Sequence, residues 1–116
     1  MTEAELNNVR TRLEELRRET LVEKDAAAES TAPVDLDQAR VGRLSRMDSM
    51  QQQAMALEQD RRRDILLKRI DGAFQRLERR NYGLCVKCSK SIEVKRVNFD
   101  PTVFFCQQCA QLAEGR

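Results

Sequence analysis

The 116-residue sequence contains no histidine and no tryptophan, and it has only four phenylalanines and one tyrosine. The absence of histidine removes the commonest acid–base residue and one of the usual zinc ligands. Scarce aromatic residues and a charged fraction of 34% are typical of exposed helices and exclude a thick globular core. Carboxylates are present, but no pocket-forming sequence surrounds them, so the chain is predicted not to be an enzyme.

Apolar segments that direct proteins to membranes are also lacking. The first five residues, Met1 to Glu5, include two glutamates and no apolar core, so they do not resemble a signal peptide. No apolar run approaches the roughly 20 residues that span a bilayer. With its cysteines expected in the reduced form, the chain is predicted to be cytoplasmic and without a membrane partner.

The cysteines are the most specific feature that is present. They form two Cys-x-x-Cys pairs: Cys85 with Cys88, and Cys106 with Cys109. Each pair brings two thiolates within reach of one ion, and two pairs complete the closed four-sulfur shell of a structural zinc site. We therefore predict one structural Zn²⁺. Two disulfides or a redox-active pair are the alternatives, and no βαβ unit supports a redox pair.

The charge balance gives no argument for nucleic acid. The formal net charge of +2 treats the thiols as neutral, whereas four thiolates and one Zn²⁺ would add about −2. The run Arg61 to Arg63 is flanked by Glu58, Asp60 and Asp64, as on a solvated helix face. Contact with phosphates is the alternative, and sequence-specific DNA binding is not expected.

The first helix is predicted from the start of the chain. Thr2 and Glu5 form a capping box. Apolar residues follow at coiled-coil spacing: Leu6, Val9, Leu13 and Leu16. Because Pro33 disfavours helical geometry at the residue before it, a break is expected near residues 30–35.

A second, longer helix is predicted to begin at Leu36, after the capping pair Asp35 and Gln38, and to end at Asn81 and Gly83. It carries two apolar stripes, Met47, Met50, Ala54 and Leu57, then Leu67, Ile70, Phe74 and Leu77. A rod of roughly 65 Å needs a partner for these residues. We expect the first helix to pack antiparallel against it, over half to two-thirds of its length. The methionines are expected in the seam, with an adaptable partner surface as the alternative.

These elements predict a mainly α fold. Residues 1–80 would form an antiparallel helical hairpin or coiled coil, and residues 81–116 a C-terminal four-cysteine zinc finger. Within the finger, Ile92, Val94 and the segment 97–99 predict two short strands. A short helix is expected from Cys106 to Glu114.

The finger resembles the DksA/TraR family of bacterial zinc-finger transcription regulators. The matching residues are Tyr82, Gly83 and Leu84 before the first pair, then Ile92, Arg96, Pro101, Thr102, Leu112, Ala113 and Glu114. The resemblance is specific over about residues 79–116 and architectural over residues 3–80. It implies a regulator that binds RNA polymerase and inserts its coiled-coil tip into the secondary channel to modulate initiation.

The resemblance also implies a tip of the form Asp-x-x-Asp-x-Ala. Asp37 and Ala39 match its second half, while Val34 stands at the first aspartate position with Asp35 beside it. Asp35 also fits a helix cap. If the hairpin turns later, at residues 42–48, Asp48 becomes the candidate.

The chain is expected to be a monomer, and the sequence leaves open whether a nucleotide effector binds. The basic residues near the cysteines, Lys87, Lys90, Lys95 and Arg96, either screen thiolate charge or contact an acidic partner or such an effector. Two other readings stay open, namely a nucleic-acid-binding zinc ribbon and a helical adaptor.

Overall fold

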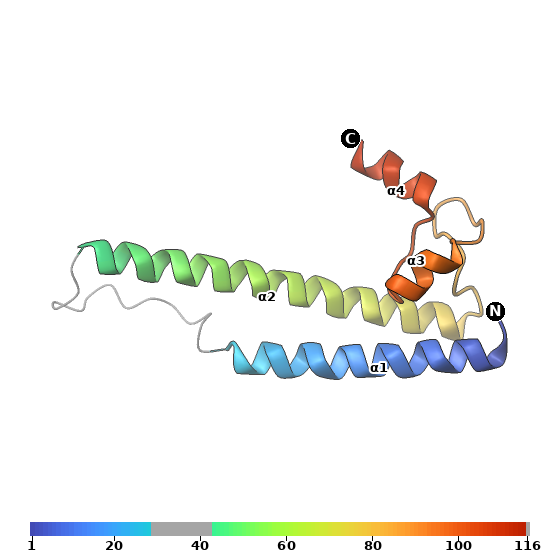
Figure 1. The fold of residues 1–116 in the computed structure, drawn as a ribbon, viewed down its shortest axis with the longest axis horizontal. Helices are drawn as coiled ribbons and strands as arrows, with labels where there is room; N and C mark the ends of the chain where they lie inside the picture. Colours follow the sequence, from blue (N-terminus) through green and yellow to red (C-terminus); the bar gives the residue numbers. More distant parts are fainter. Residues whose placement is uncertain (29–42, 116) are drawn as a thin grey trace.

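The computed structural model describes residues 1–28 and 43–115, with the backbone alone for residues 43–45. The described elements are four helices: α1 (Glu3–Ala26), α2 (Arg43–Glu78), α3 (Val94–Phe99) and α4 (Gln107–Glu114). Helices α1 and α2 run antiparallel, and the segment with α3 and α4 packs at the end where α2 stops and the chain begins (Figure 1). The mainly α fold class with a clustered C-terminal set of cysteines is thereby confirmed.

Helix α1 begins as its sequence predicts. The backbone N–H of Glu5 donates to the Thr2 hydroxyl at 3.1 Å, and that hydroxyl lies 3.2 Å from the Glu5 carboxylate. The first contact is the N-cap half of the expected capping box, whereas the Glu5 carboxylate accepts from the Thr2 hydroxyl and not from its backbone N–H. The helix ends at Ala26, and its 24 residues are two-thirds of the 36 residues of α2. The predicted break at residues 30–35 and the predicted start at Leu36 lie outside the described residues.

Helix α2 ends in a left-handed turn. Arg80 has a φ of 61°, its N–H donates to the Leu77 carbonyl at 3.2 Å, and the Asn81 N–H donates to the Arg76 carbonyl at 3.0 Å. This pair of bonds defines a Schellman motif. Gly83 supplies a positive φ of 86° as expected. At the end of α2 the left-handed residue is Arg80 rather than Asn81, because α2 stops earlier than the sequence indicates.

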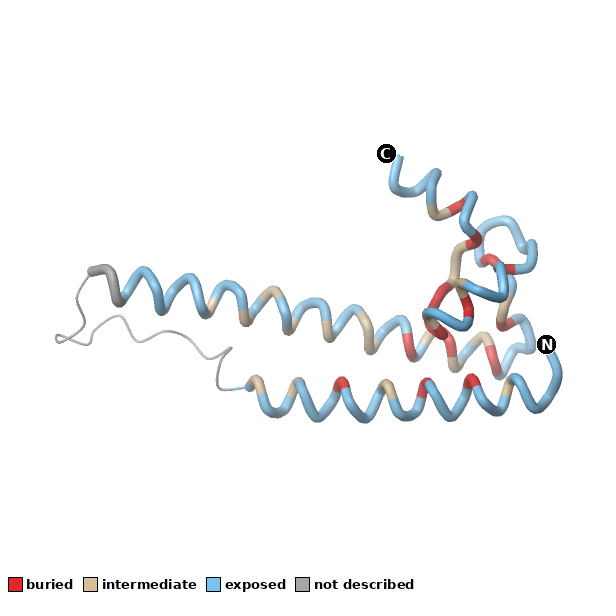
Figure 2. The backbone as a smooth tube through the Cα atoms, viewed as in Figure 1, coloured by how far each residue is buried: buried red, intermediate tan, exposed pale blue. Residues whose placement is uncertain are grey.

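One continuous core joins the hairpin to the finger. It consists of Val9, Leu13, Ile70, Ala73 and Leu77 from α1 and α2, with Tyr82, Cys85, Ile92, Val97, Val103, Cys106 and Cys109 from the finger. Most of these buried positions gather at the finger end of the molecule (Figure 2). The α1 stripe faces α2 as predicted. The second α2 stripe does so in part, with Ile70 and Leu77 buried.

Charged contacts join the two helices farther from the finger. The Lys24 ammonium lies 3.1 Å from Asp60 and 2.8 Å from Asp64. Hydrogen bonds to Asp64 and Asp60 raise the pKa of Lys24 above its ordinary value. These contacts place the last turn of α1 beside residues 60–64 of α2.

The predicted position of the methionine stripe in the seam is wrong. Met47, Met50 and Leu57 are about half exposed, with relative exposures of 51%, 50% and 48%. The reason is partly length, because α1 ends beside residues 60–64 and its described part does not reach these side chains. The stripe is also out of phase with the buried positions Ile70, Ala73 and Leu77.

The predicted strands are also corrected. The described finger contains one isolated antiparallel bridge, Leu84 with Ser91, and residues 94–99 form α3 instead. The Glu93 carbonyl accepts bonds from the N–H groups of Arg96 and Val97, which closes a helical turn. Among the apolar residues of this segment, Val97 is buried, whereas Val94 and Phe99 are exposed. The spacing of these apolar residues therefore does not indicate a strand. The predicted short helix after Cys106 is confirmed as α4.

No helix in residues 1–28 or 43–115 combines the length and apolar character that a membrane span requires.

Candidate metal centre

Two turns bring the four cysteines together. Cys85 and Cys88 follow the end of α2, while Cys106 and Cys109 stand at the start of α4. All four are free thiols, and their Sγ atoms lie within 4.8 Å of one another. Cys85, Cys106 and Cys109 are buried, and Cys88 is the most exposed. The sequence prediction that these residues converge is therefore met by the fold.

Backbone hydrogen bonds shape each turn around its sulfurs. The Ser89 N–H donates to the Cys85 carbonyl at 2.9 Å, and the Cys85 N–H donates to the Lys90 carbonyl at 2.8 Å. At the second pair, the Cys109 N–H donates to the Cys106 Sγ at 3.5 Å. Cys106 is thereby the N-cap of α4 as well as a potential ligand. The sulfurs are held by local backbone geometry.

The spacing of the sulfurs suits a metal ion. Zinc–sulfur bonds of about 2.3 Å in a tetrahedron place the sulfurs about 3.8 Å apart. The Sγ atoms of Cys88 and Cys106 are 3.7 Å apart. Four soft donors that all lie within 4.8 Å of one another can bind a metal ion, and a tetrahedral ion held by all four would have no open position for a substrate.

Two thiols of the cluster have shifted pKa values, in opposite directions. Burial opposes ionisation of Cys85, but hydrogen bonds with the backbone of Cys106, Cys88 and Lys87 outweigh it and lower its pKa to about 6. Burial raises the pKa of Cys109 to about 12, and the neighbouring thiols add to this effect. The Cys109 thiol would therefore stay protonated at neutral pH unless a positive charge lay beside it.

Two side chains that the sequence does not single out tie the finger to the hairpin. The Arg76 guanidinium donates to the Val103 carbonyl at 3.3 Å, and burial lowers the pKa of Arg76. The Arg69 guanidinium lies 5.1 Å from the centre of the Phe104 ring. Both residues belong to α2, so the orientation of the metal centre is coupled to the rod.

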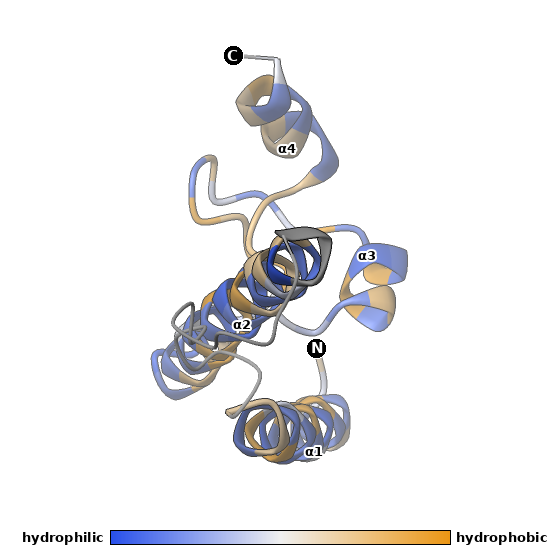
Figure 3. Ribbon diagram, turned by 90° about the vertical axis from the view of Figure 1, so that its left-hand side faces the viewer, coloured by the Kyte–Doolittle hydropathy of each residue, from blue (hydrophilic) through white to orange (hydrophobic). Residues whose placement is uncertain are grey.

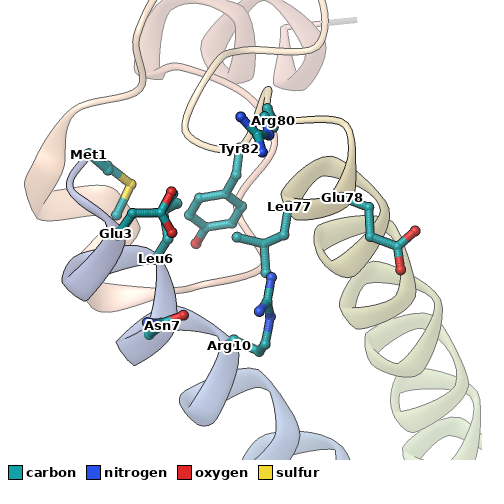
Figure 4. A pocket seen from close by; sticks show the side chains of 9 residues that line it. All are labelled: Met1, Glu3, Leu6, Asn7, Arg10, Leu77, Glu78, Arg80 and Tyr82. Atoms are coloured by element: carbon teal, nitrogen blue, oxygen red, sulfur yellow. The ribbon is translucent and has the colours of Figure 1, made fainter.

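Tyr82 makes a further link, because its buried hydroxyl donates to the Pro101 carbonyl at 2.7 Å. Figure 4 shows its ring between α1 and the end of α2, on a hollow of about 370 Å³. Two carboxylates and two guanidiniums line this hollow: Glu3, Glu78, Arg10 and Arg80. In the described residues, these side chains do not belong to a cluster that could hold a metal ion.

Tyr82 also provides a spectroscopic test of the fold. Burial raises the pKa of its hydroxyl to about 12, and it is the only tyrosine. Because the fold favours the neutral hydroxyl, this group stabilises the protein fully below about pH 10 and loses that contribution as pH rises toward 12. We expect the tyrosinate absorbance of the native protein to titrate near pH 12, and that of the denatured chain near 10. A native midpoint near the denatured one would show that Tyr82 is exposed.

The basic residues near the four cysteines differ in exposure and contacts. Lys87, Lys90 and Lys95 are exposed, whereas the Arg96 guanidinium donates to the Phe105 carbonyl at 3.3 Å. Arg96 therefore has a structural contact.

The arginine run on α2 also has acidic neighbours. Arg61 and Arg62 lie 2.7 and 3.3 Å from Glu58, and hydrogen bonds from Arg61 hold the pKa of Glu58 at about 2. Arg63 lies 3.8 Å from Asp60. These contacts favour the solvated helix face over a phosphate-binding patch.

The three predicted tip residues, Asp35, Asp37 and Ala39, lie outside the described residues. Helix α2 already includes residues 43–48, so this segment is helical and is not the alternative turn.

Known proteins resemble this chain in sequence and in structure. No family model matches the chain. The RNA polymerase-binding transcription factor DksA of Escherichia coli strain K12 is 30% identical to this chain. The alignment is 127 positions long and covers 100% of this chain and 76% of that protein. The protein of the same name from Salmonella typhimurium is 29% identical with the same coverage. The structure of transcription factor DksA2 from Pseudomonas aeruginosa matches with a TM-score of 0.75 at 24% identity, over 98% of this chain and 86% of that one.

Proposed function

The chain belongs to the DksA/TraR family, and on that premise we propose that it is a transcription regulator that binds RNA polymerase directly. The observation that carries the proposal is the match along the whole chain to a factor named for polymerase binding. The helical hairpin with four clustered cysteines at its base supports the same assignment. A polymerase partner would place the protein in the bacterial cytoplasm.

We propose that Cys85, Cys88, Cys106 and Cys109 bind one Zn²⁺. The four-sulfur donor set and the 3.7 Å separation of two sulfurs support zinc. The ion would supply the positive charge that lets all four thiols ionise. Its role is structural, because it would hold the two cysteine turns together and so fix α3 and α4 against α2.

In the proposed mechanism, the narrow hairpin brings a carboxylate close to the active site of the polymerase. Helix α2 has 36 residues and is about 54 Å long. We propose that this rod enters the secondary channel of the polymerase with the segment that contains Asp35, Asp37 and Ala39 in front. A carboxylate delivered beside the active site needs to bias a conformational equilibrium by only about 1.4 kcal/mol to change populations ten-fold.

The first test is binding of the metal-loaded chain to core RNA polymerase, followed by transcription in vitro. We expect a saturable complex and an altered yield of initiated transcripts. Failure of the wild-type chain to bind polymerase would contradict the proposal and favour a helical adaptor. Binding to bare nucleic acid with a steep salt dependence would favour the zinc-ribbon alternative.

Asp37→Asn tests the tip separately from binding. Because the substitution removes one charge and keeps the side-chain shape, we expect nearly unchanged polymerase affinity but about a ten-fold smaller effect on transcription. The measurement is transcript yield at saturating protein. Asp48→Asn, on α2, is the matched control. If Asp37→Asn retains the full effect, the tip assignment is wrong.

A further inference from the structure

The methionine stripe of α2, formed by Met47, Met50, Ala54 and Leu57, lies on the protein surface. Its residues follow one another at spacings of three, four and three, which is the spacing of a coiled-coil seam. Helix α1 ends beside residues 60–64 of α2, and α3 and α4 pack at the opposite end of the rod (Figure 1). Single exposed apolar residues are ordinary, whereas a continuous stripe is typical of an interaction surface.

The stripe lies on a different side of α2 from the face that packs against α1. That face includes Asp60, which contacts Lys24 of α1, and one turn before it the half-buried Ala56. Leu57 comes one residue after Ala56, and one residue turns an α-helix by about 100°. Figure 3, which looks along the hairpin from the end where α2 begins, shows α1 on one side of α2. The stripe therefore does not belong to the seam of the hairpin.

An antiparallel pairing of two copies of the stripe matches its spacing. In the register in which Met47 of one copy faces Leu57 of the other, Met50 faces Ala54, so all four residues of each copy meet an apolar residue. A shift by one heptad leaves only two of the four matched. The next position of the stripe is Arg61, which ends it. Such a pair is closed by a two-fold axis, so no further copies add to it.

The charges beside the stripe favour the antiparallel direction. In the same register Arg46 of one copy lies beside Asp60 of the other, and the two-fold axis repeats this pair. Arg46 is exposed and has no ion-pair partner in the part of the chain that the structure describes. Asp60 is partly exposed beside Lys24. A parallel pairing would place Arg46 beside neutral Gln51 instead, so only the antiparallel pairing brings opposite charges together.

We propose that the methionine stripe is a self-association surface through which two copies of this chain pair antiparallel. Methionine suits this role because its flexible side chain adapts to the surface it packs against. The paired segment, residues 47–57, is about 15 Å long. An interface of this length belongs to the small, transient class, so the chain is a monomer when dilute and a dimer when concentrated.

The pairing itself does not rest on the proposed function, but one consequence does. Two paired rods are wider than one, and each places a second helix beside the segment that would lead into the polymerase channel. Pairing and insertion therefore exclude each other. Self-association would then lower the amount of chain that can act on transcription.

The test is sedimentation equilibrium of the full, metal-loaded chain from about 10 μM to about 1 mM. The average mass should rise from that of one chain toward that of two, and no further. Met50→Glu should raise the dissociation constant of the dimer at least about ten-fold, because it puts carboxylates into an apolar contact. Met55→Glu is the matched control, since Met55 is on the same helix, is 64% exposed and lies outside the stripe. Both variants should melt like the wild type when dilute, because both side chains are exposed.

Arg46 tests the direction of the pairing. Arg46→Glu should weaken association about ten-fold at low salt, because the new carboxylate faces Asp60 of the second copy, and much less at high salt, where exposed charges are screened. Arg46→Lys keeps the charge and should associate like the wild type. If Arg46→Glu associated as well as the wild type at low salt, the antiparallel arrangement would be overturned.

The remaining outcomes separate this inference from the proposed function. A wild-type chain that stays monomeric up to about 1 mM would overturn self-association. Equal association of the wild type and Met50→Glu would do the same, because the stripe would then lie outside the interface. If the chain pairs as expected and does not bind polymerase, the proposed function fails alone. If it stays monomeric and Met50→Glu weakens polymerase binding, the stripe serves the polymerase and self-association is overturned.

Discussion

Removing the metal ion should unfold the finger while the hairpin keeps much of its helix. The buried residues of the finger include Cys85, Cys106 and Cys109 themselves, so the site is part of the core it would stabilise. A segment of this size does not hold itself by apolar burial alone. In such small domains the free energy of metal binding is also folding free energy.

Elemental analysis should find one zinc ion for each reduced chain. After chelation, far-ultraviolet circular dichroism should lose the signal of α3 and α4 and keep most of that of α1 and α2. The near-ultraviolet environment of Tyr82 should change, because its bond to the Pro101 carbonyl depends on the folded finger. Reduced protein that contains no tightly bound metal would refute this prediction.

Cys106→Ser gives the same test by mutation. It replaces a potential ligand that is also the N-cap of α4, so we expect loss of bound zinc and of the ordered finger. Gln107→Ser is the control, because it introduces the same residue at the adjacent exposed position. If Cys106→Ser retained one zinc ion and a wild-type spectrum, Cys106 would not be a ligand.

The features that the sequence predicts correctly are those set by local chemistry. The spacing within each pair, Cys85 with Cys88 and Cys106 with Cys109, places two thiols in one turn. That the two pairs meet is predicted from the four-sulfur donor set that a zinc site requires. Thr2 starts α1 through a bond three residues away. The role of these cysteines as zinc ligands, and the division of the chain at residue 80, stay predictions.

The errors arise where distant parts of the chain decide the outcome. Segment 94–99 contains enough β-branched and aromatic residues to suggest a strand. Instead it forms α3, which buries Val97 in the finger core and leaves Val94 and Phe99 exposed. The contacts of Arg12 with Asn98 and of Arg76 with Val103 have no local signal at all. They exist only because the finger docks back onto the hairpin.

Leu13→Asp should destabilise the hairpin severely. Leu13 is 0% exposed and lies in the cluster with Val9, Ile70, Ala73 and Leu77. A carboxylate there would be buried without a partner, which typically costs at least about 3 kcal/mol in free energy of unfolding. In a chain of this size each kcal/mol corresponds to about 4 °C or more, so the melting temperature should fall by at least about 12 °C.

Val22→Asp is the control for the Leu13 substitution, because Val22 is on the same helix and is 63% exposed. We expect it to change the free energy of unfolding by no more than about 0.5 kcal/mol. An unchanged melt for Leu13→Asp would show that Leu13 does not face α2.

The zinc content of Leu13→Asp shows whether the hairpin and the finger fold independently. If the metal alone organises the finger, the variant should keep one zinc ion while its hairpin melts early. Loss of zinc would instead mean that the hairpin and finger fold as one unit around the core that joins Leu13 to the cysteines.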